Sequence, residues 1–233
     1  AATYTCTVTD ARGCTTTEQV TITEPAAALA ITLTKNDGCY FLNNGTATAT
    51  VTGGTTAYTY SWNTNPVQTT ATATSLAPGT YIVTVTDANN CTEDNTITLA
   101  QPAILTATGV GTTNVNCNGG SDGTATIVAG GGAQPYTYLW NDPSGQTTAQ
   151  ATGLVAGTYT CVVTDNNGCT RSSNQLTITE PAAALGSSST QTNVLCNGAS
   201  TGAIDLTVTG GTTSYTYSWH NGTSVVSTDA DPT

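Results

Sequence analysis

The stretch Gly79-Thr80-Tyr81-Ile82-Val83-Thr84-Val85-Thr86-Asp87, which is followed by Cys91-Thr92, decides the fold. Tyr81, Val83 and Val85 point to one side, and the threonines with Ile82 point to the other. This period of two predicts a β-strand, because β-branched and aromatic residues suit a pleated, half-buried surface. The same pattern occurs at residues 3–10 before Cys14 and at residues 157–165 before Cys169.

The pattern belongs to a larger repeat. Two sets of landmarks recur at nearly the same step along the chain: Cys39, Cys117 and Cys196, and Trp62, Trp140 and Trp219. A spacing shared by independent landmarks predicts a tandem repeat. We interpret residues 1–25 as the end of a preceding repeat, 26–102 and 103–181 as full repeats, and 182–233 as the first two thirds of a following one. The chain is therefore expected to be a window of a longer array.

Each repeat is expected to be a small antiparallel sandwich. In the first full repeat the pattern predicts strands at 29–34, 46–52, 58–62, 71–76, 79–87 and 96–99, with turn residues between them. Short strands at this density are typical of two packed sheets, so the predicted fold is all-β, with tandem immunoglobulin-like sandwiches of about 78 residues. The expected core consists of Tyr60, Trp62, Leu76, Tyr81, Val83 and Val85. The X-Pro junctions favour extended connections, which would place the repeats end to end as a stalk.

The acidic composition of the chain argues against two classes of binding partner. The chain has 3 Lys and Arg against 14 Asp and Glu, which leaves a net charge of −11. A phosphate backbone or an anionic lipid surface would repel such a chain, so nucleic acid and membrane surfaces are poor partners. Regularly spaced Tyr, Trp, Val and Cys residues count against a disordered chain.

Eight cysteines at recurring positions indicate disulfides and an oxidising, extracellular compartment. Zinc is disfavoured because no Cys-x-x-Cys pair occurs. The disulfide candidates are Cys39, Cys91, Cys117 and Cys169. Cys6 and Cys161 align with Val83 on the inward face of the central strand, so they are expected to be small buried hydrophobic residues.

Two pairings of these candidates are open. Pairing within a repeat, Cys39 with Cys91 and Cys117 with Cys169, would close a loop of some fifty residues and contribute on the order of 4 kcal/mol. In an immunoglobulin-like strand order, however, those cysteines would lie at opposite ends of the sandwich, and Cys169 would instead meet Cys39 across a junction. We favour the pairing within a repeat.

Carboxylates recur near the junctions, at Asp10, Asp87 and Asp165 and at Glu24 and Glu180. They could hold Ca²⁺ and stiffen the stalk. The competing interpretation is that each Asp caps its own turn through an Asx hydrogen bond. Because Gln101 replaces Glu at one junction and no Asp-x-Asp-x-Asp run exists, no cofactor is expected.

Enzyme chemistry finds little support in the sequence. The one histidine, His220, lies beside Asn221-Gly222 and is interpreted as a solvated turn residue. A Ser–His–Asp arrangement cannot recur through the repeats with a single His, and no glycine-rich phosphate loop leads into a helical pattern. The chain is therefore expected to be non-catalytic.

The motifs resemble a known family. Asn193-Val194-Leu195-Cys196-Asn197-Gly198, Gly210-Gly211-Thr212 and Tyr215-Thr216-Tyr217-Ser218-Trp219 are similar to the SprB-type repeat of Bacteroidetes cell-surface adhesins. The order and spacing hold over essentially the whole chain, although Asp37-Gly38-Cys39-Tyr40 departs from the pattern in one loop.

The resemblance implies a very large adhesin, exported by the type IX secretion system and, in gliding bacteria, moved by the motility machinery. Its repeats would be a stalk whose partners are neighbouring repeats of the same chain, with no catalytic residues to transfer. Two alternatives remain: a subunit that self-associates laterally into an extracellular filament or sheath, and a carbohydrate-binding module using Tyr58, Tyr60 and Trp62 as a stacking platform.

Overall fold

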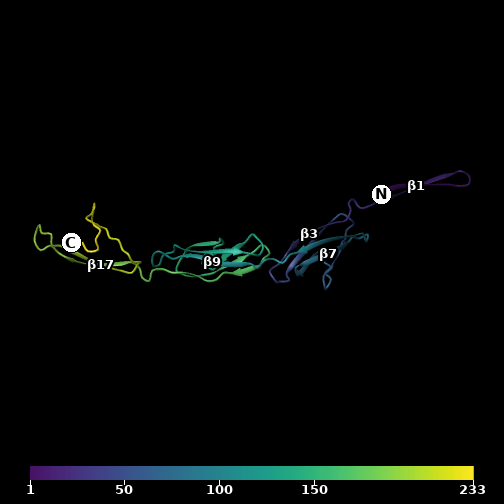
Figure 1. The fold of residues 1–233 in the computed structure, drawn as a ribbon. Helices are drawn as coiled ribbons and strands as arrows, with labels where there is room; N and C mark the ends of the chain where they lie inside the picture. The colour runs from purple at the N-terminus through teal and green to yellow at the C-terminus, as the bar shows by residue number, and fades with distance from the viewer. Residues whose placement is uncertain (233) are drawn as a thin grey trace. The chain divides into compact units, whose positions relative to one another are not determined.

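The computed structural model describes residues 1–232 and divides into two compact units, 1–104 and 105–233. The whole described chain is built from strands and turns, and no helix in it could cross a bilayer. Figure 1 shows the strands running lengthwise within each unit. The division of the chain into four parts at residues 25, 102 and 181 stays a prediction.

The first unit contains one complete sandwich of two three-stranded antiparallel sheets. One sheet has the order β3-β4-β6 and the other has the order β5-β7-β8. The strands are β3 (Ala30–Asn36), β4 (Gly45–Thr52), β5 (Thr59–Trp62), β6 (Thr72–Leu76), β7 (Gly79–Thr86) and β8 (Thr92–Leu99). The first, second and fourth strands thus form one layer and the others form the second, which is the immunoglobulin-like arrangement expected from the sequence.

The core lies between these two layers. Trp62, Val83 and Val85 from one sheet are at most 1% exposed and share a cluster with Ala47, Ala49 and Ala73 from the other. The cross-strand pairs Trp62–Val83 and Tyr60–Val85 place these residues on one face, as the alternation predicts. Leu76 is buried as expected, whereas Tyr60 and Tyr81 are only partly buried.

Strand β8 differs from the prediction because it begins at Thr92 instead of residue 96. It pairs with β7 along the whole length of both strands, from Thr86–Thr92 to Gly79–Leu99. Two hydrogen bonds also join β8 to β3 in the other sheet: Asn95 Nδ2 donates to the Ile31 carbonyl at 2.8 Å, and Lys35 Nζ donates to the Thr98 carbonyl at 2.7 Å. They close one side of the sandwich with polar contacts.

The second unit repeats this sandwich with a local irregularity. Its strands are β9 (Thr106–Thr113), β10 (Gly123–Gly130), β11 (Thr137–Trp140), β12 (Gln150–Leu154), β13 (Gly157–Tyr159), β14 (Cys161–Thr164), β15 (Thr170–Ser172) and β16 (Leu176–Ile178). The central strand is split at Thr160 into β13 and β14, and the strand that pairs with it is split at residues 173–175 into β15 and β16. This pairing strand has one residue more than β8, its counterpart in the first unit, and the surplus residue forms a bulge.

Each unit also contains a partial repeat. Hairpin β1 (Ala2–Thr9) and β2 (Thr15–Ile22) is a two-stranded sheet whose residues are all exposed. Strands β17 (Gly186–Thr192), β18 (Ala203–Thr209), β19 (Trp219–His220) and β20 (Val225–Ser227) form two further two-stranded sheets. The expectation that Cys6 is buried is therefore wrong, because β1 pairs with β2 alone and no second layer covers it in the described chain.

Candidate functional site

The recurring cysteines lie at the two ends of each sandwich. One end, where the chain leaves the sandwich, holds the loop after the first strand. In the first sandwich Asp37 Oδ1 accepts from the Ala100 backbone N–H at 2.9 Å, just after β8 ends. In the second, Asn118 Nδ2 donates to the Pro181 carbonyl at 2.9 Å. The loops of Cys39 and Cys117 are therefore held at the exit ends.

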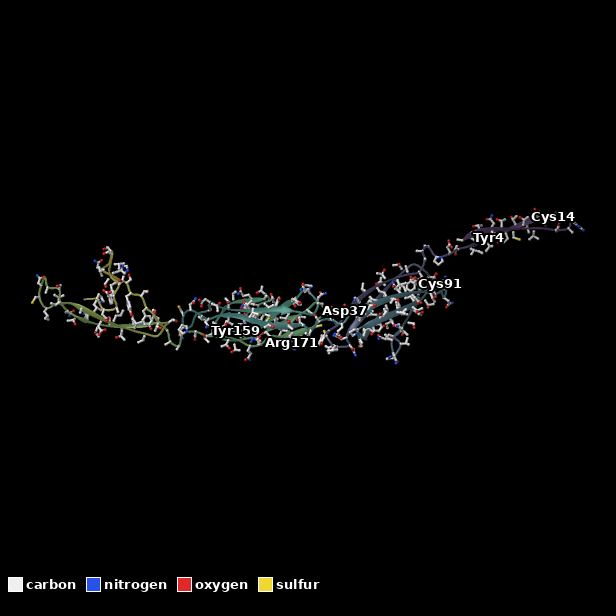
Figure 2. The ribbon with its side chains drawn as sticks, in the orientation of Figure 1. Tyr4, Cys14, Asp37, Cys91, Tyr159 and Arg171 are labelled. Atoms are coloured by element: carbon white, nitrogen blue, oxygen red, sulfur yellow. The ribbon has the colours of Figure 1, made fainter. Side chains whose placement is uncertain are left out.

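The opposite end, where the chain enters the sandwich, holds the hairpin of the central strand. Asp87 Oδ2 accepts from the Thr55 N–H at 2.9 Å, and Asp87 Oδ1 accepts from the Cys91 N–H at 2.9 Å. The Gly54 N–H donates to the carbonyl of Ala27 on the entering segment. In Figure 2, Cys91 and Asp37 lie at opposite ends of the first sandwich.

The hairpin carboxylates are Asx caps. Asp87 is 4% exposed, and the backbone N–H groups of Thr55, Cys91 and Asn89 hold its pKa below 3.8 against the opposing effect of burial. Asp165 accepts the equivalent hydrogen bonds from the backbone N–H groups of Ala133, Asn167 and Cys169. Asp10 caps its own turn by accepting hydrogen bonds from the backbone N–H groups of Arg12 and Cys14. These carboxylate oxygens are thus engaged by backbone donors, as the Asx interpretation expects.

Another buried carboxylate was missed by sequence reasoning. Asp142 is 7% exposed in the turn after β11 and accepts from the backbone N–H groups of Gln146 and Ser144. Burial raises its pKa, but the bonds from Gln146 and Ser144 outweigh burial, so the pKa is lowered overall. The signal available in the sequence was an Asp-Pro-Ser-Gly turn at 142–145. Within residues 1–232, no group of three or more His, Cys, Asp or Glu residues could hold a metal ion.

The cysteines divide into two states. Cys39 and Cys169 are disulfide-bonded, whereas Cys6, Cys14, Cys91, Cys117, Cys161 and Cys196 are free thiols. The favoured pairing within a repeat is wrong for this structure, because Cys91 and Cys117 are free. The physical reason is the length of the sandwich: an eight-residue strand such as β7 spans about 23 Å, whereas a disulfide needs Cα atoms within about 7 Å.

Cys161 behaves as the sequence predicts for its position. It is 0% exposed in the core of the second sandwich, opposite Trp140 in the strand pairing. Burial raises the pKa of its thiol above 9.0. It is therefore a small core residue whose sulfur is protected from solvent.

The aromatic residues do not form an exposed platform. Trp62 is 1% exposed, and its Nε1 donates to the Thr70 carbonyl at 2.9 Å. The Tyr58 hydroxyl donates to the Gly53 carbonyl at 2.6 Å and closes the turn after β4. These rings serve the sandwich itself, so the carbohydrate-stacking interpretation loses its basis.

His220 lies in β19 and not in a turn, and its Nε2 is 3.0 Å from Ser218 Oγ. Its side chain is exposed, as expected. The two residues lie two positions apart in the sequence, and no Asp is bonded to the ring among the contacts of the described chain. The pair does not assemble a Ser–His–Asp constellation.

These features define a class: a protein of tandem immunoglobulin-like β-sandwiches whose recurring loop and hairpin cysteines lie at the sandwich ends, the hairpin cysteines beside Asx caps. The SprB repeat model matches three segments of the chain, 32–67, 110–145 and 188–224. The starting points of the three segments are evenly spaced along the chain. The chain therefore matches the SprB repeat model in three tandem segments, as the sequence motifs predict.

The chain matches several solved structures at low sequence identity and low TM-score. A 282-residue C-terminal fragment of intimin, solved with the intimin-binding domain of the translocated intimin receptor, has a TM-score of 0.33 and 17% identity over 66% of this chain and 65% of that one. A tetra-tandem repeat from the extending region of a large adhesion protein has a TM-score of 0.27 and 15% identity over 88% of this chain and 63% of that one. The BSP domain of a biofilm-associated protein has a TM-score of 0.23 and 18% identity over 65% and 30% of the two chains. No curated protein matches the chain.

Proposed function

We propose that this chain is a non-catalytic segment of the stalk of a large bacterial cell-surface adhesin. The observation that carries the proposal is the even recurrence of SprB repeat segments on immunoglobulin-like sandwiches. Its work would be mechanical: to hold a binding tip away from the cell and to bear load. Surface attachment is the proposed role of the parent protein, with gliding motility and type IX secretion following from the family resemblance.

The internal construction of the sandwich supports a load-bearing role. The hydrogen bonds between β7 and β8 extend over eight residue pairs, so force along the strands would shear many bonds at once. No buried side-chain nitrogen or oxygen in residues 1–232 lacks a hydrogen-bond partner. A fully satisfied polar interior favours one rigid state.

The location can be tested on intact cells of the bacterium that carries the gene. Antibodies raised against residues 26–181 should label unpermeabilised cells, and deleting the gene should reduce attachment to surfaces. An antigen that is reached only after the cells are opened would contradict a surface stalk.

Solution scattering separates the stalk from the filament alternative. Chains with added copies of a full repeat should stay monomeric and lengthen linearly with repeat number. Fibres that form as the concentration rises would favour a laterally assembling filament subunit.

A further inference from the structure

We propose that the first full sandwich carries a binding groove for a neutral oligosaccharide, formed by residues of the loop 63–68, the turn 74–77 and the ring of Tyr81. The groove has a volume of about 600 Å³, and ligand sites in proteins usually measure about 300–1,000 Å³. All of its residues belong to the unit 1–104. The groove gives this segment a ligand in addition to the stalk function proposed above.

The walls of the groove are held in place by hydrogen bonds within the sandwich. Gln68 Nε2 donates to the Thr74 carbonyl at 2.9 Å, and Gln68 Oε1 accepts from the Thr74 N–H at 2.9 Å, so the loop is joined to the turn. Asn63 Oδ1 accepts from the Ile82 N–H at 2.9 Å, which joins the loop to β7. A groove formed in advance loses little conformational freedom when a ligand binds.

Tyr81 supplies an aromatic wall. Its hydroxyl donates to the Ala77 carbonyl at 2.8 Å, which fixes the ring, and its side chain is only partly buried, whereas its counterpart Tyr159 in the second sandwich is 6% exposed. A sugar ring carries C–H groups that pack against an aromatic ring and hydroxyls that need polar partners. Tyr81 is separate from Tyr58 and Trp62, whose polar atoms close turns of the sandwich itself.

Polar partners for such hydroxyls surround the groove. Among the side-chain hydrogen bonds of residues 1–232, none involves the Asn65 amide or the hydroxyls of Thr74 and Ser75, although all three residues line the groove. The amide offers two donors and an acceptor, and each hydroxyl offers a donor and acceptors. These groups are therefore available to a ligand without breaking a bond of the fold.

Ser75 has a backbone conformation that the fold alone does not explain. Its φ is 57°, in the left-handed region that residues with a side chain adopt at a cost in free energy. Its counterpart in the second sandwich is Gly153, with a φ of 66°, which avoids this cost. Because the Ser75 hydroxyl makes no hydrogen bond within residues 1–232, glycine would serve the fold better. Binding of a ligand by the hydroxyl accounts for the serine.

The charge of the groove selects the class of sugar. None of the residues that line it is charged, whereas the corresponding turn of the second sandwich has Asp142 in place of Thr64. An uncharged groove cannot compensate the lost hydration of an ion, and the net charge of −11 repels anions. The ligand is therefore a neutral sugar chain without carboxylate or sulfate groups.

Nuclear magnetic resonance of the ¹⁵N-labelled full chain tests the site. One aromatic wall and a few hydrogen bonds predict a Kd on the order of 1 mM, so each sugar is added to about 10 mM. The probes are maltotriose, cellotriose, laminaritriose, mannotriose and chitotriose, with the anionic trigalacturonate as the control. At least one neutral sugar should shift the backbone amide signals of residues 63–68 and 74–77. Shifts there with none of the neutral sugars, or with trigalacturonate alone, would overturn the proposal.

Two variants remove the free polar groups and leave the walls intact. Ser75→Gly and Asn65→Ala should each raise the Kd of the bound sugar by about 2-fold to 10-fold, as expected for one lost hydrogen bond. Thr69→Ala, at an exposed hydroxyl outside the groove, is the matched control and should leave the Kd unchanged. An unchanged Kd in both groove variants would contradict the site.

The stability of Ser75→Gly separates binding from a role in the fold. Glycine adopts the left-handed conformation freely, so the urea midpoint of this variant should not fall below that of the parent chain. A weaker affinity at an undiminished midpoint is the expected result. A lower midpoint would show that the Ser75 side chain supports the fold, and would overturn its assignment to the ligand.

Discussion

At the residue scale, Asp87 shows how a single carboxylate organises the entry end of a sandwich. Asp87→Asn keeps the shape of the side chain, but its amide group cannot accept hydrogen bonds at both ends. One of the backbone donors, Thr55 N–H or Cys91 N–H, then loses its acceptor. We expect the variant to be less stable than the parent chain at pH 7 in urea unfolding followed by Trp fluorescence. Asp94→Asn, at an exposed position of β8, should leave stability unchanged.

The pH dependence of this difference follows from the direction of the Asp87 pKa shift. The folded-state pKa lies below 3.8, so the ionised carboxylate stabilises the fold at pH values above 3.8. That stability is lost as the pH falls through the lowered pKa. The gap between Asp87→Asn and the parent chain should therefore be constant near neutrality and shrink in acid below pH 3.8. A gap that widens in acid would contradict the role given to Asp87.

Cys161 makes a second prediction at the same scale. Its thiol is buried and its pKa is raised, so little thiolate is present and little reagent can reach it. In the folded chain at pH 8.5, iodoacetamide should modify exposed Cys91 much faster than Cys161, as measured by peptide mass spectrometry. In denaturant the two rates should become similar. Equal rates in the folded chain would show that the core around Cys161 opens readily.

The residues also show what the sequence could and could not predict. Alternation identifies Trp62, Val83 and Val85 as core residues because burial on one face of a strand leaves a period of two. The favoured cysteine pairing is wrong because loop-closure entropy takes no account of the length of the strands that separate Cys39 from Cys91. Spacing along the chain does not say at which end of a sandwich a loop lies.

At the scale of elements, the bulge in the second sandwich contains a specific hydrogen bond. Ser173 Oγ accepts from the Cys161 N–H at 3.0 Å, at the point where the central strand and its partner are both interrupted. Ser173→Ala leaves this buried N–H without its acceptor, which should cost about 1–3 kcal/mol in the free energy of unfolding. Ser172→Ala, one residue earlier on an exposed strand, is the matched control and should change the free energy little. Equal losses for the two variants would show that the Ser173 contact carries no special energy.

The bulge marks a limit of reading elements from sequence. The central strands of the two full repeats have the same length and pattern, and the alternation predicts a continuous strand in both. The split at Thr160 is imposed by the partner strand, which has one more residue and must bring Leu176 back into register with Tyr159. Register is a property of two strands together, so a pattern in one strand cannot predict it.

At the scale of the whole molecule, the sequence period determined the architecture while leaving the links between repeats open. The regular step between landmarks predicts that each full repeat carries the same two ends, and each of the two sandwiches in the structure has a loop cysteine at one end and a hairpin cysteine at the other. The entering segment 24–29 reads Glu-Pro-Ala-Ala-Ala-Leu, and residues 180–185 read the same.

That identity allows the independence of the sandwiches to be tested. A chain in which a second copy of residues 26–181 follows Pro181 reproduces the sequence of the natural junction. Because each sandwich has a core cluster of its own, we expect the added copies to fold as the first ones do. The circular dichroism per residue of the longer chain should therefore equal that of residues 26–181 alone, and a loss of β signal per residue would contradict independent sandwiches.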